Sequence, residues 1–311
     1  MGASSDKHGA AGPPSSRRAG GHKLARVVFV TGKGGVGKTT VAAALAVGAA
    51  ERDGRSVLVE FGDGESGARV LAKSHPKVVH VPLPAHEAVV RAFSSLFGPA
   101  IVGRAVLSNF AVKRFVGAAP AIRELGMLES VRLVAEEHPG AQVFVDMPAT
   151  GHGVAWLRAP AQFAALVDGG PLLKLTSRLR DELVAKGRCS IVVVTLPERL
   201  VVRETLELVV AIERDVELTA TRLVVNRFPA AVPEGAVRDA RAMAVSSSPL
   251  AGAAADLAAA LEAREDANRE ALEALSDALH STRLEPVILK DAGADPPLDE
   301  VARWLAKERF G

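Results

Sequence analysis

The chain has 311 residues, with 38 Lys and Arg against 36 Asp and Glu, so its net charge does not favour a nucleic-acid-binding specialist. One cysteine, Cys189, excludes an intramolecular disulfide and a multi-cysteine metal cluster within one chain. No apolar run reaches the roughly 18 residues of a spanning helix, and the N-terminus lacks the apolar run of a secretion signal. We therefore expect a cytoplasmic protein.

Residues 1–25 are expected to form a disordered basic tail. The segment combines Gly, Ser, Pro and Ala with several basic side chains, and it has too little apolar surface to fold. Contact of this tail with nucleic acid or anionic lipid is the alternative that remains open. The folded domain is then expected over residues 26–311.

Short β-branched runs alternate with longer helical stretches along this domain. Such alternation is typical of an α/β fold with a doubly wound, mainly parallel sheet covered on both faces. Ligands of this fold class bind outside the carboxyl ends of the strands. The predicted strands are 27–30, 57–59, 143–145, 191–194 and 223–225, with 286–289 as a sixth, and the clearest helices are 39–52 and 198–213.

Two stretches are longer than a simple crossover connection. Residues 84–138 show helical spacing with Gly and Pro breaks, which predicts a helical insertion. Its apolar residues could line a groove for a partner or belong to the core; they include Leu96, Phe97, Ile101, Leu107, Phe110 and Phe115. Residues 231–282 are Ala-rich and charged, and they predict one long exposed helix.

The final helical pattern, near residues 298–305, has an apolar face beside basic residues. We expect it to pack on the sheet as the last helix of the domain. A membrane-surface helix is the alternative.

The segment that follows the first strand matches a phosphate-binding loop, G-x-x-x-x-G-K-[ST], and precedes an Ala-rich helix. Its backbone N–H groups are expected to cradle the phosphates of ATP, aided by the positive end of the helix dipole. Lys38 would neutralise the β and γ phosphates, and the Thr39 hydroxyl would coordinate Mg²⁺. The predicted ATP contacts in this segment are Gly32, Gly34, Gly35, Val36, Gly37, Lys38, Thr39 and Thr40. Asn226, at the end of a later strand, is a further predicted ATP contact.

Asp146 ends the third apolar run, VFVD. An acidic residue at the carboxyl end of a strand is placed to hold Mg²⁺ or its water, which makes Thr39 and Asp146 the predicted metal ligands. The alternative is a residue that caps the following helix.

The loop KGGVGKTT carries a second lysine, Lys33, and Asp146 opens the stretch DMPATGHG. With TLPE after residue 194 and VVN ending at Asn226, these motifs resemble the ArsA-type family of anion-transporting and tail-anchored-protein targeting ATPases, which have a deviant Walker A loop. The resemblance implies a face-to-face dimer in which Lys33 acts on the partner's nucleotide. A solvated loop lysine is the alternative.

The same resemblance gives two further residues a role. It implies that Asn226 contacts adenine, although an ordinary turn residue after a strand is also consistent with it. It implies that His152 belongs to a nucleotide-responsive switch, although a structural place at a helix start fits equally.

The chain departs from the family after its second strand, where relatives carry D-P-A-H-S. Here the sequence is EFGDGES, from Glu60 to Ser66. Asp63 is the nearest candidate for the carboxylate that orients the attacking water, with Glu60 as a substitute. The predicted catalytic residues are thus Lys33, Lys38, Asp63 and Asp146, and slow turnover follows if no carboxylate reaches the water.

The function favoured by these motifs is an Mg²⁺-dependent ATP-hydrolysing dimeric switch that captures or releases a protein client. Two alternatives remain open. One is a regulatory subunit of a heteromer formed with a paralogue, with weak turnover of its own. The other is a spatial-organisation ATPase like ParA or MinD, acting on DNA or membrane through its tails.

Overall fold

The computed structural model describes residues 23–71, 75–97, 120–148, 153–228, 233, 235–246, 249–279, 284, 286–291 and 298–307. The predicted tail up to residue 22 lies outside these ranges. So do residues 98–119 of the predicted insertion and the segment from Thr150 to His152. The proposed domain boundaries therefore stay predictions.

Seven strands form one sheet in the order β3-β2-β4-β1-β5-β6-β7, and every neighbouring pair is parallel. This is the α/β architecture of a P-loop NTPase, as predicted. The strands are β1 (Val27–Gly32), β2 (Ser56–Phe61), β3 (Val78–Leu83), β4 (Gln142–Asp146), β5 (Cys189–Thr195), β6 (Arg222–Phe228) and β7 (Pro286–Lys290).

All six predicted strands are confirmed, and β3 is the one that the sequence pattern missed. Its sequence, VVHVPL, places a histidine and a proline among the valines, and most of its residues are only partly buried. Proline is tolerated at a sheet edge because an edge strand leaves some N–H groups unpaired. The edge position therefore explains why β3 lacks the continuous apolar run of a central strand.

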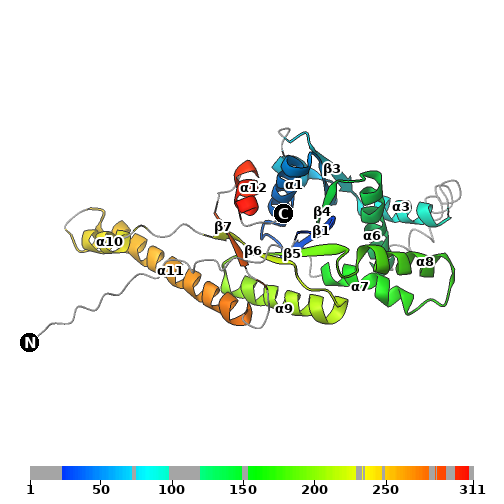
Figure 1. The fold of residues 1–311 in the computed structure, drawn as a ribbon. Helices are drawn as coiled ribbons and strands as arrows, with labels where there is room; N and C mark the ends of the chain where they lie inside the picture. Colours follow the sequence, from blue (N-terminus) through cyan, green and yellow to red (C-terminus); the bar gives the residue numbers. More distant parts are fainter. Residues whose placement is uncertain are drawn as a thin grey trace, which may run out of the picture.

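The helices cover both faces of the sheet (Figure 1). Their bounds are α1 (Lys38–Asp53), α2 (Glu65–Leu71), α3 (Ala85–Phe97), α6 (Pro120–Glu137), α7 (Gly153–Ala164), α8 (Gly170–Arg178), α9 (Arg199–Val216), α10 (Ala236–Ala244), α11 (Ala251–Leu279) and α12 (Leu298–Lys307), with a π-helical turn at Leu179–Leu183 after α8.

Alternate residues of the strands feed two separate hydrophobic cores. Val28 and Val30 of β1 pack beneath α1 and α12, whereas Val27 and Phe29 point to the opposite core with α6, α7 and α9. Helix α1 is buried along most of its length because its alanines let it lie close to the sheet. This central position holds the start of α1 rigidly at the carboxyl edge of β1.

Helix α12 packs on α1, and its apolar residues Leu298, Val301 and Leu305 are buried in that core. Packing of the last helix within the domain is therefore confirmed. The membrane-surface alternative is wrong for this face because the face is already covered. Among the described residues, no helix is both long enough and apolar enough to cross a membrane.

The predicted long helix is α11, which follows the short helix α10. Its C-terminal part packs on α9 through Ala271, Leu275 and Leu279, which are buried. Helix α10 and the first half of α11 extend away from the sheet beyond β7 (Figure 1). The fold thus has a compact α/β part and a projecting helical arm.

Candidate functional site

The loop between β1 and α1 depends on glycines at two positions of close approach. A Cβ at Gly32 would lie 2.3 Å from the carbonyl oxygen of Val194, and a Cβ at Gly37 would lie 2.3 Å from Nδ2 of Asn226. Both residues also have positive φ, 148° and 90°, which non-glycine residues rarely adopt. The loop is therefore packed against β5 at Gly32 and against β6 at Gly37. Backbone N–H groups in a glycine-rich turn of this kind can bind an anion.

Lys38, the first residue of α1, is buried, with 6% of its surface exposed. Its Nζ donates a hydrogen bond to the carbonyl oxygen of Lys33 at 2.9 Å. Burial lowers the pKa of Lys38, and the nearby Asp146 carboxylate partly restores it. A buried ammonium at the start of a helix is a strong site for an anion such as a phosphate.

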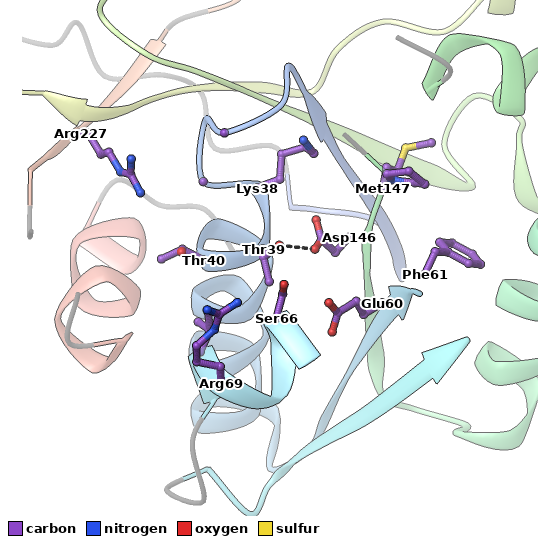
Figure 2. A pocket seen from close by; sticks show the side chains of 14 residues that line it. Lys38, Thr39, Thr40, Glu60, Phe61, Ser66, Arg69, Asp146, Met147 and Arg227 are labelled. Atoms are coloured by element: carbon purple, nitrogen blue, oxygen red, sulfur yellow. Dashed lines mark hydrogen bonds between the residues drawn. The ribbon is translucent and has the colours of Figure 1, made fainter. Parts of the chain in front are cut away.

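Thr39 and Asp146 meet at the carboxyl edge of the sheet, as Figure 2 shows, with a hydrogen bond of 2.5 Å from Thr39 Oγ1 to Asp146 Oδ2. Burial raises the pKa of Asp146 to about 6; Thr39 and Lys38 oppose that shift, and Glu60 adds to it. The other oxygen, Oδ1, is buried and has no hydrogen-bond partner among the described residues.

This pair fits Mg²⁺. A hydroxyl and a carboxylate are hard oxygen ligands of the kind that Mg²⁺ takes, and in phosphate sites it uses only one or two protein ligands. A buried carboxylate oxygen without a partner is costly, and a cation would satisfy it. No cluster of three or more His, Cys, Asp or Glu side chains with metal-binding geometry occurs in the part of the chain that the structure describes.

These residues line a pocket of about 650 Å³ at the carboxyl ends of β1, β2, β4 and β6. Helix α2 forms one wall, where Ser66 and Arg69 line the pocket, and Arg227 comes from the end of β6 (Figure 2). The motif search missed these three residues. For Arg227 the sequence held one signal, its place directly after Asn226 at a strand end; its positive φ of 52° is visible only in the structure.

The two candidates for the water-orienting carboxylate, Asp63 and Glu60, lie in different places relative to the pocket. Asp63 is exposed, does not line the pocket, and accepts a hydrogen bond from the N–H of Glu65 at 3.0 Å, which caps α2. Glu60 is buried, with 6% exposed, and lines the pocket opposite Asp146. Of these two candidates, Glu60 is therefore the one that lies in the pocket. The catalytic role assigned to Asp63 stays a prediction without support from this placement.

Lys33 lies on the outer side of the loop. Its Nζ is 2.6 Å from Oε2 of Glu204 on α9, and both side chains are about two-fifths exposed (41% and 40%). It does not line the pocket of its own chain. Its action on a partner's nucleotide stays a prediction.

Asn226 supports the loop directly. Its Nδ2 donates a hydrogen bond to the carbonyl oxygen of Val36 at 2.9 Å, and the side chain is buried. The contact with adenine stays a prediction. Cys189 begins β5 and is partly buried against the core. Burial raises the pKa of its thiol to about 12, as in an unreactive structural cysteine.

Comparison with known proteins agrees with this geometry. The family model described as Anion-transporting ATPase matches residues 25–63, which carry β1, the loop, α1 and β2. ATPase BagA of Mycobacterium tuberculosis and a protein of Mycobacterium bovis also named as an ATPase are each 30% identical to this chain over 223 residues. This chain is thus similar to the ArsA-type ATPases.

The aligned region covers 65% of this chain and 65% of the length of each relative, which is less than two thirds. The family model covers the phosphate-binding loop and Glu60 but ends before α2. The similarity therefore supports the fold and the phosphate-binding loop that the sequence predicted. Activity, client and assembly require an argument from the site itself.

Proposed function

We propose that this chain binds ATP with Mg²⁺ and hydrolyses it as a dimeric switch that captures or releases a protein client. The loop N–H groups and Lys38 would hold the phosphates, and Thr39 and Asp146 would hold the metal. Bound there, Mg²⁺ would neutralise charge on the β and γ phosphate oxygens. The chain's own contribution is to fix these groups on one rigid edge of the sheet.

One observation carries the nucleotide part of this proposal. Asp146, beside the buried Lys38 at the N-terminus of α1, has a buried oxygen that no described residue contacts by a hydrogen bond. Burying an ammonium and a carboxylate with one unpaired oxygen is costly in an ordinary core, because both groups must be desolvated. An anion bound with a divalent cation would satisfy both groups at once.

The direct test uses Lys38→Ala. We expect this variant to lose ATP binding, because it removes the cation that faces the β and γ phosphates. Isothermal titration with ATP in the presence of Mg²⁺ measures the loss, and circular dichroism checks that the fold is retained. Equal ATP affinity in the variant and the wild type would refute the site assignment.

The dimer part of the proposal is supported by the position of Lys33. The Lys33 side chain is about two-fifths exposed and does not line the pocket. In the same chain, Lys38 already lines the pocket where the phosphates would bind. Reaching a partner's nucleotide would require it to leave Glu204. The exposed ion pair costs little to break, at most about 1 kcal/mol.

Coupling to a client is supported by a chain of contacts. Phe61, a pocket residue at the end of β2, packs edge-on against Trp156 of α7, with ring centroids 4.8 Å apart. Helix α7 packs on α6, which packs on α3. A shift of the pocket wall would thus reach the two described helices of the predicted insertion, where a client would bind.

Turnover measured against protein concentration tests the assembly. We expect a steep rise with concentration if two copies complete one site. A second candidate is a heteromer with a paralogue, and the exposed position of Asp63 favours it, because the usual water-orienting aspartate is then missing from this chain's pocket. A steep rise only on mixing with a co-purifying paralogue would select the heteromer.

A further inference from the structure

Glu60 is buried in the pocket wall and lies beside the partly buried His80, and the phosphate and metal contacts use neither of these titratable side chains. We propose that Glu60 is the catalytic residue that orients the attacking water, and that His80 is the positioning residue that aims Glu60. This inference rests on the proposed ATP hydrolysis and assigns the role that the altered segment after β2 leaves open.

Sheet register puts these groups on one face. Glu60 of β2 pairs with Asp146 of β4, and His80 of β3 pairs with Leu58, two residues before Glu60. Partners in register on parallel strands point to the same side, as do residues two apart on one strand. Glu60, Asp146 and His80 therefore all face the side that carries α1 and α2, where the loop holds the phosphates.

The Glu60 carboxylate makes both of its contacts through one oxygen, Oε2. Its Oε2 accepts a hydrogen bond from the N–H of Gly67 on α2 at 2.8 Å, and it lies 3.0 Å from Nε2 of His80. The carboxylate acceptor assigns the proton of the imidazole to Nε2. Within the described residues Oε1 has no hydrogen-bond partner, while the residue lines the pocket.

The contact requires a glycine at position 67. A Cβ there would lie 2.5 Å from Glu60 Oε2 and 2.6 Å from His80 Nε2. The backbone of α2 thus lies in direct contact with the pair. This close approach leaves Glu60 one well-defined orientation, which is what a water-orienting carboxylate needs.

The chemistry that follows is a displacement at the γ-phosphorus. Glu60 Oε1 accepts a hydrogen bond from a water in the pocket. The water oxygen forms a bond to the γ-phosphorus as the bond to the β–γ bridging oxygen breaks, and ADP leaves with that oxygen. The water proton passes to Glu60 and then to solvent.

The test is Glu60→Gln in the full-length chain. The amide oxygen still accepts from Gly67 and His80, but its NH₂ group now points into the pocket as a donor. We expect kcat to fall by about 10²-fold or more, with ATP affinity unchanged. We also expect loss of tight binding of ADP with aluminium fluoride, which mimics the phosphoryl group in flight and needs an oriented water. Glu265→Gln, on the exposed surface of α11, is the matched control.

His80 is tested by rescue. His80→Ala removes the donor and should lower kcat by about tenfold, whereas His80→Gln restores a donor and should recover most of the loss. Gly67→Ala should resemble His80→Ala; Gly252→Ala, where a Cβ meets nothing within 4 Å, controls for helix substitution. Equal losses in the Ala and Gln variants of His80 would overturn its positioning role.

Three further outcomes decide the inference. Wild-type turnover and aluminium fluoride binding in Glu60→Gln would overturn it. Loss of both in Asp63→Asn, with Glu60→Gln active, would assign the role to Asp63 and overturn it too. A wild-type chain that binds ATP but never hydrolyses it, alone or mixed with its paralogue, would refute the proposed hydrolysis, and this inference with it.

Discussion

Asp146 has an environment very different from that of an ordinary surface carboxylate. Burial raises its pKa to about 6, and one of its oxygens has no partner among the described residues. A group whose pKa is higher in the folded state favours folding only while it is protonated. The ionised carboxylate therefore destabilises the nucleotide-free protein at neutral pH, which is the expected cost of a site shaped for a cation.

Removing the charge of Asp146 should therefore stabilise the nucleotide-free protein at neutral pH. Asp146→Asn mimics the protonated form and keeps an acceptor for Thr39. It should raise the free energy of unfolding by up to about 3 kcal/mol at pH 7 without nucleotide, and the gain should vanish as the pH falls from about 6 to about 4. Urea unfolding at several pH values measures it.

The exposed Asp256→Asn on α11 is the control for Asp146→Asn. The same Asp146 variant should lose Mg²⁺-dependent ATP binding, so stability and function should change in opposite directions. A variant less stable than the wild type at pH 7 would contradict the account of Asp146.

Asn226 offers a second prediction at this scale. Its bond to Val36 holds the phosphate-binding loop, so Asn226→Ala should destabilise the fold by about 1 kcal/mol and weaken ATP and GTP equally. If the side chain also contacts adenine, as the family resemblance implies, only the ATP affinity should fall steeply. Competition between the two nucleotides in equilibrium binding separates the two roles.

At the scale of elements, the phosphate-binding loop and α9 are joined by the ion pair of Lys33 and Glu204. An exposed pair contributes up to about 1 kcal/mol. Because Glu204→Gln removes the competitor for Lys33, the protein concentration at half-maximal turnover should fall by up to about fivefold. Lys33→Ala should instead keep ATP binding and lose the concentration-dependent turnover.

Arg203→Gln on α9 is the control for Glu204→Gln and Lys33→Ala, because it also breaks an exposed ion pair on α9. Arg203 pairs with Glu207, one turn along the same helix. Unchanged concentration dependence in Glu204→Gln would show that the ion pair does not restrain Lys33. Full turnover in Lys33→Ala would remove the lysine from the proposed two-chain site.

At the scale of the whole molecule, Phe61 and Trp156 connect the pocket to the helices beyond α7. Phe61→Leu keeps an apolar side chain but removes the edge-on ring contact. We expect ATP binding to persist, while nucleotide-dependent changes in hydrogen exchange across α6 become smaller. Phe228→Leu, another partly buried phenylalanine at a strand end, is the control. Unchanged exchange in Phe61→Leu would refute this coupling route.

Features set by neighbouring residues could be predicted from the sequence. They include the glycines and Lys38 of the loop, the six apolar strands and the acidic end of β4, since each depends on residues within a few positions of one another. Strand β3 was missed because an edge strand needs no continuous apolar run. Helices α11 and α12 were predicted because their periodicity spans several turns.

Contacts between distant segments were decided by the tertiary structure alone. Sheet register brings Glu60 opposite Asp146 and beside His80, while the turn after β2 leaves Asp63 outside as a helix cap. The partners of Lys33 and Asn226 lie on α9 and in the phosphate-binding loop. By itself the sequence determined that a nucleotide loop exists and where it begins. Strand pairing decides that Glu60, and not Asp63, lies in the pocket next to Asp146. Strand pairing is a property of the folded sheet.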